Sequence, residues 1–67
     1  MTDPRQVVNT SLQALRRATA QEIAKAAGLP LAQTYESLVA LEACELARVE
    51  VTHDRVGVGY YREWVAA

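Results

Sequence analysis

The sequence predicts a small α+β fold in which three helices precede a C-terminal β-hairpin. Apolar residues recur at helical spacing from the first residues to about Cys44. A capping signal and a glycine delimit a short helix in the middle of that region. After Leu46 the apolar period changes from 3.6 to 2, as in a half-buried strand. The 67 residues have room for one domain, 1–67.

The first helix is expected to begin at Asp3-Pro4. Aspartate is a good N-cap, proline is favoured at the first helical position, and Gln6 stands where a capping box has its second member. The expected buried stripe consists of Val8, Leu12 and Leu15. Arg16 and Arg17 are expected in the last turn, where cations offset the helix dipole.

The second helix has the clearest ends. Thr19 and Glu22 match a capping box, and Gly28 can adopt the left-handed conformation that ends a helix. Leu29 is expected to pack back into the core. The narrow face of this helix consists of Ala20, Ile23, Ala24 and Ala27.

The third helix is expected to run from Pro30 to about Cys44. Its expected inward side consists of Leu31, Thr34, Tyr35, Leu38, Leu41 and Glu42. Its expected outward side consists of Gln33, Glu36, Ser37, Ala40 and Ala43.

The residues after Leu46 predict a β-hairpin, because apolar and polar side chains alternate in its first strand. Ala47, Val49 and Val51 are expected on the inward face of its first strand. A turn is expected at His53-Asp54-Arg55, and a second strand from Val56 to Val65. Tyr60, Arg62 and Trp64 fall on one face of that strand, opposite Tyr61, Glu63 and Val65. Trp64 is expected in the core, and an exposed aromatic on the other face would suit a protein partner.

Charge is spread unevenly along the chain, whose net charge is −1. Residues 1–30 carry four basic and two acidic side chains, whereas residues 31–50 carry one basic and four acidic ones. DNA-binding proteins usually have a basic excess, because phosphate neutralisation supplies much of their affinity. The acidic segment therefore favours a protein partner.

The sequence favours a protein that is not an enzyme. It contains no nucleophile–base pair, phosphate-binding loop or metal motif, and no cofactor is expected. Cys44, near a helix end and between glutamates, is a poor redox sensor, and His53 suits hydrogen bonding in a turn better than metal binding. No apolar run reaches the ~20 residues of a membrane span, and the first residues lack a secretory core, so a cytoplasmic location is expected.

Several segments resemble a known family. Thr19 to Leu29, TAQEIAKAAGL, resembles the first helix and turn of a bacterial helix-turn-helix. Core positions of a recognition helix and the start of a wing are matched by Thr34, Leu38, Leu41-Glu42 and Leu46-Ala47-Arg48. Tyr60-Tyr61-Arg62 resembles the returning wing strand. Over about residues 6–63 the chain thus resembles winged helix-turn-helix regulators of the MarR, ArsR and GntR kind.

Three positions depart from that pattern. Glu45 stands where these families commonly have glycine, Thr34 where they have an apolar β-branched residue, and Pro30 where they have a polar cap. A second resemblance, in length, helix order and Arg62-Glu63-Trp64, is to the FeoC family of ferrous-iron transport proteins. The wing of that family typically carries a cysteine cluster, whereas His53 to Gly59 contains no cysteine, so no iron–sulfur site is implied.

The first resemblance implies sequence-specific binding of double-stranded DNA by a small bacterial or phage transcription regulator. The candidate contacts are Arg16, Arg17, Lys25, Ala32, Gln33, Glu36, Ser37 and Arg55. Ala32, Gln33 and Ser37 would meet base edges, since recognition helices use their N-terminal turns in the groove. Glu36 could accept a hydrogen bond from cytosine or repel phosphates.

The basic candidates would hold the DNA backbone. Arg55 would anchor the wing, and Arg16, Arg17 and Lys25 would contact phosphates. The alternatives are a solvated face for the third helix, an ordinary charged turn at Arg55, and dipole compensation by Arg16 and Arg17.

So small a chain would need a homodimer on two half-sites for tight binding, through the first helix or a sheet edge. The alternative function, which the FeoC resemblance implies, is a winged-helix protein–protein interaction module, an accessory or regulatory subunit that does not bind DNA.

Overall fold

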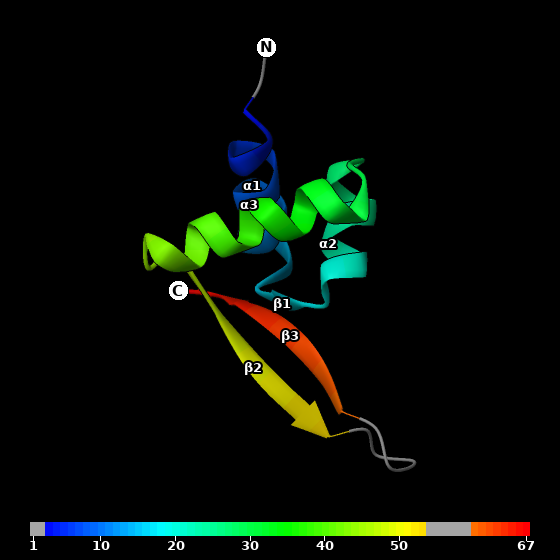
Figure 1. Cartoon of the computed structure of the whole chain (residues 1–67), viewed down its shortest axis with the longest axis vertical. Coiled ribbons are helices and arrows are strands. Elements are labelled where there is room, and N and C mark those ends of the chain that lie inside the picture. The colour runs from blue at the N-terminus through cyan, green and yellow to red at the C-terminus, as the bar shows by residue number, and fades with distance from the viewer. Residues whose placement is uncertain (1–2, 54–59) are drawn as a thin grey trace.

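The computed structural model describes residues 3–53 and 60–67, and in them three helices lie over one end of a three-stranded sheet (Figure 1). The elements in chain order are α1 (Pro4–Leu15), β1 (Arg17–Ala18), α2 (Ala20–Ala27), α3 (Leu31–Ala43), β2 (Ala47–His53) and β3 (Tyr60–Ala66). This order confirms the predicted α+β class and the winged helix-turn-helix arrangement of three helices followed by a hairpin.

The sheet is antiparallel, with strand order β1-β3-β2. Trp64 of β3 lies between Ala18 of β1 and Val49 of β2 in the strand register. The chain end is held to the helical layer, because the Ala66 amide donates to the Arg16 carbonyl at 2.9 Å. The two-residue strand β1 is absent from the sequence prediction.

α1 begins as predicted and ends earlier than predicted. The Asp3 carboxylate caps the helix by accepting from the Arg5 amide at 2.9 Å. Arg16 follows the helix with a φ of 68°, and Arg17 already belongs to β1. The prediction that both arginines lie in the last turn was therefore wrong. Leu15, expected in the core, is 44% exposed where the helix ends.

α2 has the predicted ends. The Thr19 hydroxyl accepts from the Glu22 amide at 3.2 Å, and the Glu22 carboxylate accepts from the Thr19 amide at 3.1 Å. Gly28 ends the helix with a φ of 69°, a conformation that glycine adopts without steric cost. These local signals were sufficient because both partners of each cap lie within four residues of each other.

The core lies between the helices and the inner face of the sheet. Its buried apolar members are Val8, Leu12, Ala18, Ala20, Ile23, Leu38, Leu41, Ala47 and Trp64. Leu29 packs against this cluster, as predicted. Trp64 is 3% exposed, which confirms that it packs in the core.

The hairpin extends beyond the helices (Figure 1). The inward face of β2 is covered only at Ala47, so Val51 is 62% exposed despite the alternation that predicted its burial. His53, assigned to the turn from sequence, instead pairs with Tyr60 at the end of the sheet. The predicted turn residues Asp54 and Arg55 and the predicted strand start at Val56 lie outside the described residues.

Candidate nucleic-acid interface

The face of α3 that packs inward is defined by Thr34, Ser37, Leu38 and Leu41. Their spacing of three and four residues is that of one helical stripe. Two of the four are polar, and each donates its hydroxyl back along the helix: Thr34 Oγ1 to the Pro30 carbonyl at 3.0 Å and Ser37 Oγ to the Gln33 carbonyl at 2.9 Å. Because of these bonds, burial leaves neither hydroxyl without a hydrogen-bond partner.

Ser37 is therefore not on the outward face, contrary to the sequence prediction. Its side chain is 5% exposed, and its hydroxyl hydrogen is already donated. The helical spacing of the apolar residues placed Ser37 outward, whereas its hydroxyl, bonded to the preceding turn, packs as a small core residue.

The exposed part of α3 contains the other three candidates on this helix. Ala32, Gln33 and Glu36 are exposed in its first two turns. Gln33 and Glu36 lie beside the start of α1, where they line a shallow hollow together with Asp3 and Arg5. Arg5 is a basic side chain near the candidate interface and was not among the predicted contacts. Its charge is paired with the Asp3 carboxylate at 3.1 Å.

Apolar side chains are also exposed on α3, and two of them, Leu31 and Tyr35, were predicted to face inward. Leu31, Tyr35 and Val39 follow one another at intervals of four residues, and Val39 is 54% exposed. Tyr35 packs edge-on against Trp64, with ring centroids 6.0 Å apart. Val49, the register partner of Trp64 in β2, is itself 37% exposed.

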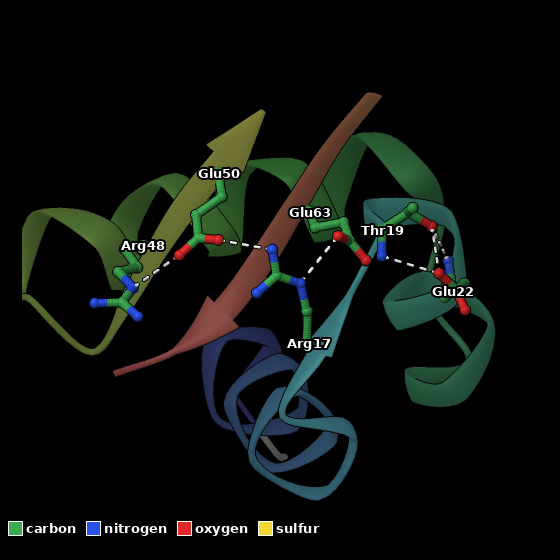
Figure 2. A network of polar contacts seen from close by, with 6 residues as sticks. All are labelled: Arg17, Thr19, Glu22, Arg48, Glu50 and Glu63. Carbon is green, nitrogen blue, oxygen red and sulfur yellow. Dashed lines mark hydrogen bonds and ion pairs between the residues drawn. The ribbon is translucent and has the colours of Figure 1, made fainter. Parts of the chain in front are cut away.

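Arg17 lies within an ion-pair network on the outer face of the sheet (Figure 2). Its guanidinium binds Glu63 Oε1 at 2.9 Å and Glu50 Oε1 at 2.6 Å, and Arg48 Nε lies 3.5 Å from Glu50 Oε2. The hydrogen bonds to Glu63 and Glu50 raise the pKa of Arg17. With two carboxylates on its guanidinium, Arg17 is a poor candidate for a phosphate contact.

Arg16 and Lys25 are exposed, and neither forms an ion pair within residues 3–53 and 60–67. Lys25 lies in the last turn of α2, and Arg16 lies at the junction between α1 and β1. Arg55, the predicted anchor of the wing, lies outside the described residues. Of the predicted basic contacts, Arg16 and Lys25 are therefore the ones without an ion pair in the part of the chain that the structure describes.

The described residues contain no group of three or more His, Cys, Asp and Glu side chains placed to hold a metal ion. Cys44 is an exposed free thiol just after α3. None of the described helices is long and apolar enough to cross a membrane.

Comparison with known proteins supports the fold. Stf76 from the Sulfolobus islandicus plasmid-virus pSSVx is similar in structure, with a TM-score of 0.81 and 15% sequence identity over 97% of this chain and 82% of that protein. BpsR of Bordetella bronchiseptica, in a structure concerned with regulation of its DNA binding by 6-hydroxynicotinic acid, is similar with a TM-score of 0.78 and 19% identity. This match covers the whole chain and 48% of BpsR. No family model and no curated protein sequence matches the chain.

Proposed function

We propose that this protein binds double-stranded DNA through α3, as a small regulator of transcription. The observation that carries the proposal is the exposed N-terminal part of α3, whose opposite face is anchored in the core. Winged helix-turn-helix domains present a recognition helix to the major groove in this way. The similarity to BpsR, a protein whose DNA binding is regulated, supports the proposal.

Three exposed residues of α3 would meet base edges. Gln33 offers an amide that can bind adenine in a bidentate manner, Glu36 can accept from the cytosine amino group, and Ala32 can contact a thymine methyl group. Ser37 is left out of this set because it is buried.

Phosphate contacts would come from Arg16 and Lys25, together with Arg55 of the wing. Arg17 is left out because Glu50 and Glu63 hold its guanidinium. With so few cations, one copy would bind weakly, so we expect two copies to bind adjacent half-sites. A bacterial or phage origin and a cytoplasmic location belong to the same proposal.

The test is the salt dependence of binding to a mixed-sequence DNA duplex, followed by fluorescence anisotropy between about 50 and 200 mM salt. Lys25→Gln should reduce the slope of log affinity against log salt by about one, since it removes one phosphate contact. Arg48→Gln removes the same charge from the outer face of the sheet and should leave the slope unchanged. Equal slopes for all three proteins would contradict the assignment of Lys25, and absence of binding at low salt would contradict the function.

A second candidate function is a protein–protein interaction module. It is favoured by the exposed apolar row of Leu31, Tyr35 and Val39, which a DNA-binding helix does not need. A partner on this row, including a second copy, would cover α3. Light scattering should then detect association that Val39→Lys abolishes, whereas a monomer at high concentration would remove self-association as the explanation of this row.

A further inference from the structure

We propose that the free edge of β2 pairs with the same edge of a second copy of this chain, in an antiparallel register centred on Val49. β2 is an outer strand of the sheet, whose order is β1-β3-β2. Figure 1 shows β3 along one side of β2, and no strand of the described residues along the other side. The pairing would join the sheets of two copies into one continuous sheet. This inference does not depend on DNA binding.

The backbone groups at this edge lack hydrogen-bond partners. Leu46 and Ala67 form a hydrogen-bonded pair in line with β2 and β3, because the Ala67 amide donates to the Leu46 carbonyl at 3.2 Å. Hydrogen-bonded pairs alternate along an antiparallel ladder, so Ala47, Val49 and Val51 direct their amides and carbonyls away from β3. In the described part of the chain, no backbone hydrogen bond from another element reaches these groups. A second strand would supply the missing partners.

The sequence of β2 does not protect this edge. Natural proteins commonly block an exposed edge with lysine, proline, a bulge or a very short strand. β2 has seven residues, contains neither lysine nor proline, and pairs with β3 in one unbroken register. It is therefore longer than the typical strand of about five to six residues. Such a strand is suited to pairing with another strand.

The charges on β2 select one register for a second copy. Arg48 and Glu50 lie on the outer face of the sheet (Figure 2). A two-fold axis at Val49 sets Arg48 of each copy opposite Glu50 of the other, so the favourable contact occurs twice. An axis at Arg48 or at Glu50 would instead oppose like charges. The Arg48 side chain can reach across, because it is 67% exposed and lies 3.5 Å from Glu50 of its own chain.

The same register brings exposed apolar side chains together on the inner face of the sheet. Val49 is 37% exposed and Val51 is 62% exposed. Val49 would lie beside Val49 of the second copy, and Val51 beside its Ala47. Both contacts would remove apolar surface from water. Because the interface covers one strand edge in each copy, it is small, and we expect a dissociation constant of about 0.01–1 mM.

The first experiment detects nuclear Overhauser effects between copies, in a mixture of ¹³C-labelled and unlabelled protein at about 1 mM without DNA. The register sets Arg48 and Glu50 of different copies in a pair that is not hydrogen-bonded, with Cα atoms about 4.5 Å apart. An effect between the α-protons of these two residues is therefore expected. Within one strand the same Cα atoms are about 7 Å apart, so the effect reports on the pairing. Its absence, or a monomer by light scattering at that concentration, would overturn the proposal.

The second experiment reverses charges to test the register. Arg48→Glu should weaken self-association by at least about tenfold, because a carboxylate then opposes Glu50 at two symmetric places. Glu50→Arg should weaken it for the converse reason. An equimolar mixture of these two variants should associate again, since each carries the charges that the other lacks. Arg62→Glu makes the same change of charge on β3 and should leave self-association unchanged.

Self-association that survives Arg48→Glu would overturn the proposal, as would a mixture of the two folded variants that stays monomeric. Glu50 also binds Arg17, so the wild-type measurement and Arg48→Glu decide the matter if Glu50→Arg does not fold. Association that only Val39→Lys abolishes would assign it to the exposed row of α3 and overturn the pairing of β2.

Failure of this pairing leaves the proposed function intact, because neither measurement uses DNA. Pairing of β2 displaces no counterions from DNA, so Arg48→Gln remains a control for the salt slope of the DNA titration.

Discussion

Glu45 adopts a backbone conformation that is costly for its side chain. Its φ is 61°, and with Arg16 it is one of two non-glycine residues with positive φ in the described chain. The left-handed region costs an L-residue about 1–2 kcal/mol, and glycine avoids that cost. Glu45 stands where the winged-helix families that the sequence resembles commonly have glycine, and its left-handed backbone explains that preference.

Replacing this residue should stabilise the protein. Glu45→Gly is expected to raise the free energy of unfolding by about 0.5–1 kcal/mol, because relief of the left-handed conformation exceeds the added entropy of the unfolded chain. Urea denaturation measures the change. Glu42→Gly, three residues earlier and helical, should lower the same quantity by about 0.5–1 kcal/mol. A decrease of similar size in both variants would contradict this account of Glu45.

At the scale of elements, the helix limits set by caps and the hairpin were predictable, and the third strand of the sheet, β1, was not. Thr19, Glu22 and Gly28 act on their own neighbours, so the sequence suffices to place α2. β1 is only Arg17-Ala18, and nothing in these two residues signals a strand before Val65 and Trp64 of β3 lie beside them. Strand pairing between residues 46 and 48 positions apart is a property of the tertiary structure.

The rotation of α3 was the second element-scale error. Ser37, predicted outward, faces the core, and Tyr35, predicted inward, is 37% exposed beside Trp64. A hydroxyl that is hydrogen-bonded to the preceding helical turn can pack in the core like a small apolar group. The spacing of hydrophobic residues alone does not reveal such a position. The exposed start of α3 was consequently predictable at Ala32, Gln33 and Glu36. The pairing of Arg17 was not, because folding brings Glu50 and Glu63 beside it from more than 30 residues away, whereas Arg5 pairs with its sequence neighbour Asp3.

The start of α1 should make stability depend on pH in the acid range. Hydrogen bonds from Arg5 lower the pKa of Asp3 from 3.8. A lowered carboxyl pKa contributes stability that is complete above the unfolded value and is lost as pH falls through the folded value. Asp3→Asn keeps a capping side chain without titrating. Denaturation at about pH 6 and pH 2.5 should show the wild type losing more stability than Asp3→Asn. Equal losses would contradict the role of Asp3.

The outer face of the sheet should be sensitive to loss of Arg17. Glu50 and Glu63 are direct register partners, and Arg17 lies between their carboxylates (Figure 2). Arg17→Gln leaves two like charges opposed, so the melting temperature should fall, and the fall should be smaller in high salt because exposed charges are screened. Arg16→Gln, which removes a neighbouring charge without an ion pair in the described chain, is the control. A salt-independent effect of Arg17→Gln would indicate lost packing in place of lost charge.

At the scale of the whole molecule, fold and charge favour different partners. The three helices and hairpin form a winged helix-turn-helix, whereas the chain has a net charge of −1 and three acidic residues from position 36 to position 45. Fold by itself does not determine function, so the site must decide. Gln33 at the exposed start of α3 favours DNA, and the apolar row from Leu31 to Val39 favours a protein.

The most direct test of DNA binding by α3 is an NMR titration of the labelled protein with duplex DNA at about 50 and 200 mM salt. Binding through α3 predicts shifts at Ala32, Gln33 and Glu36 that weaken in the higher salt. Gln33→Ala should reduce discrimination at one base pair by about 1–3 kcal/mol, and Ser37→Ala should not change it. An unchanged spectrum at low salt, or shifts confined to residues away from α3, would contradict the central claim.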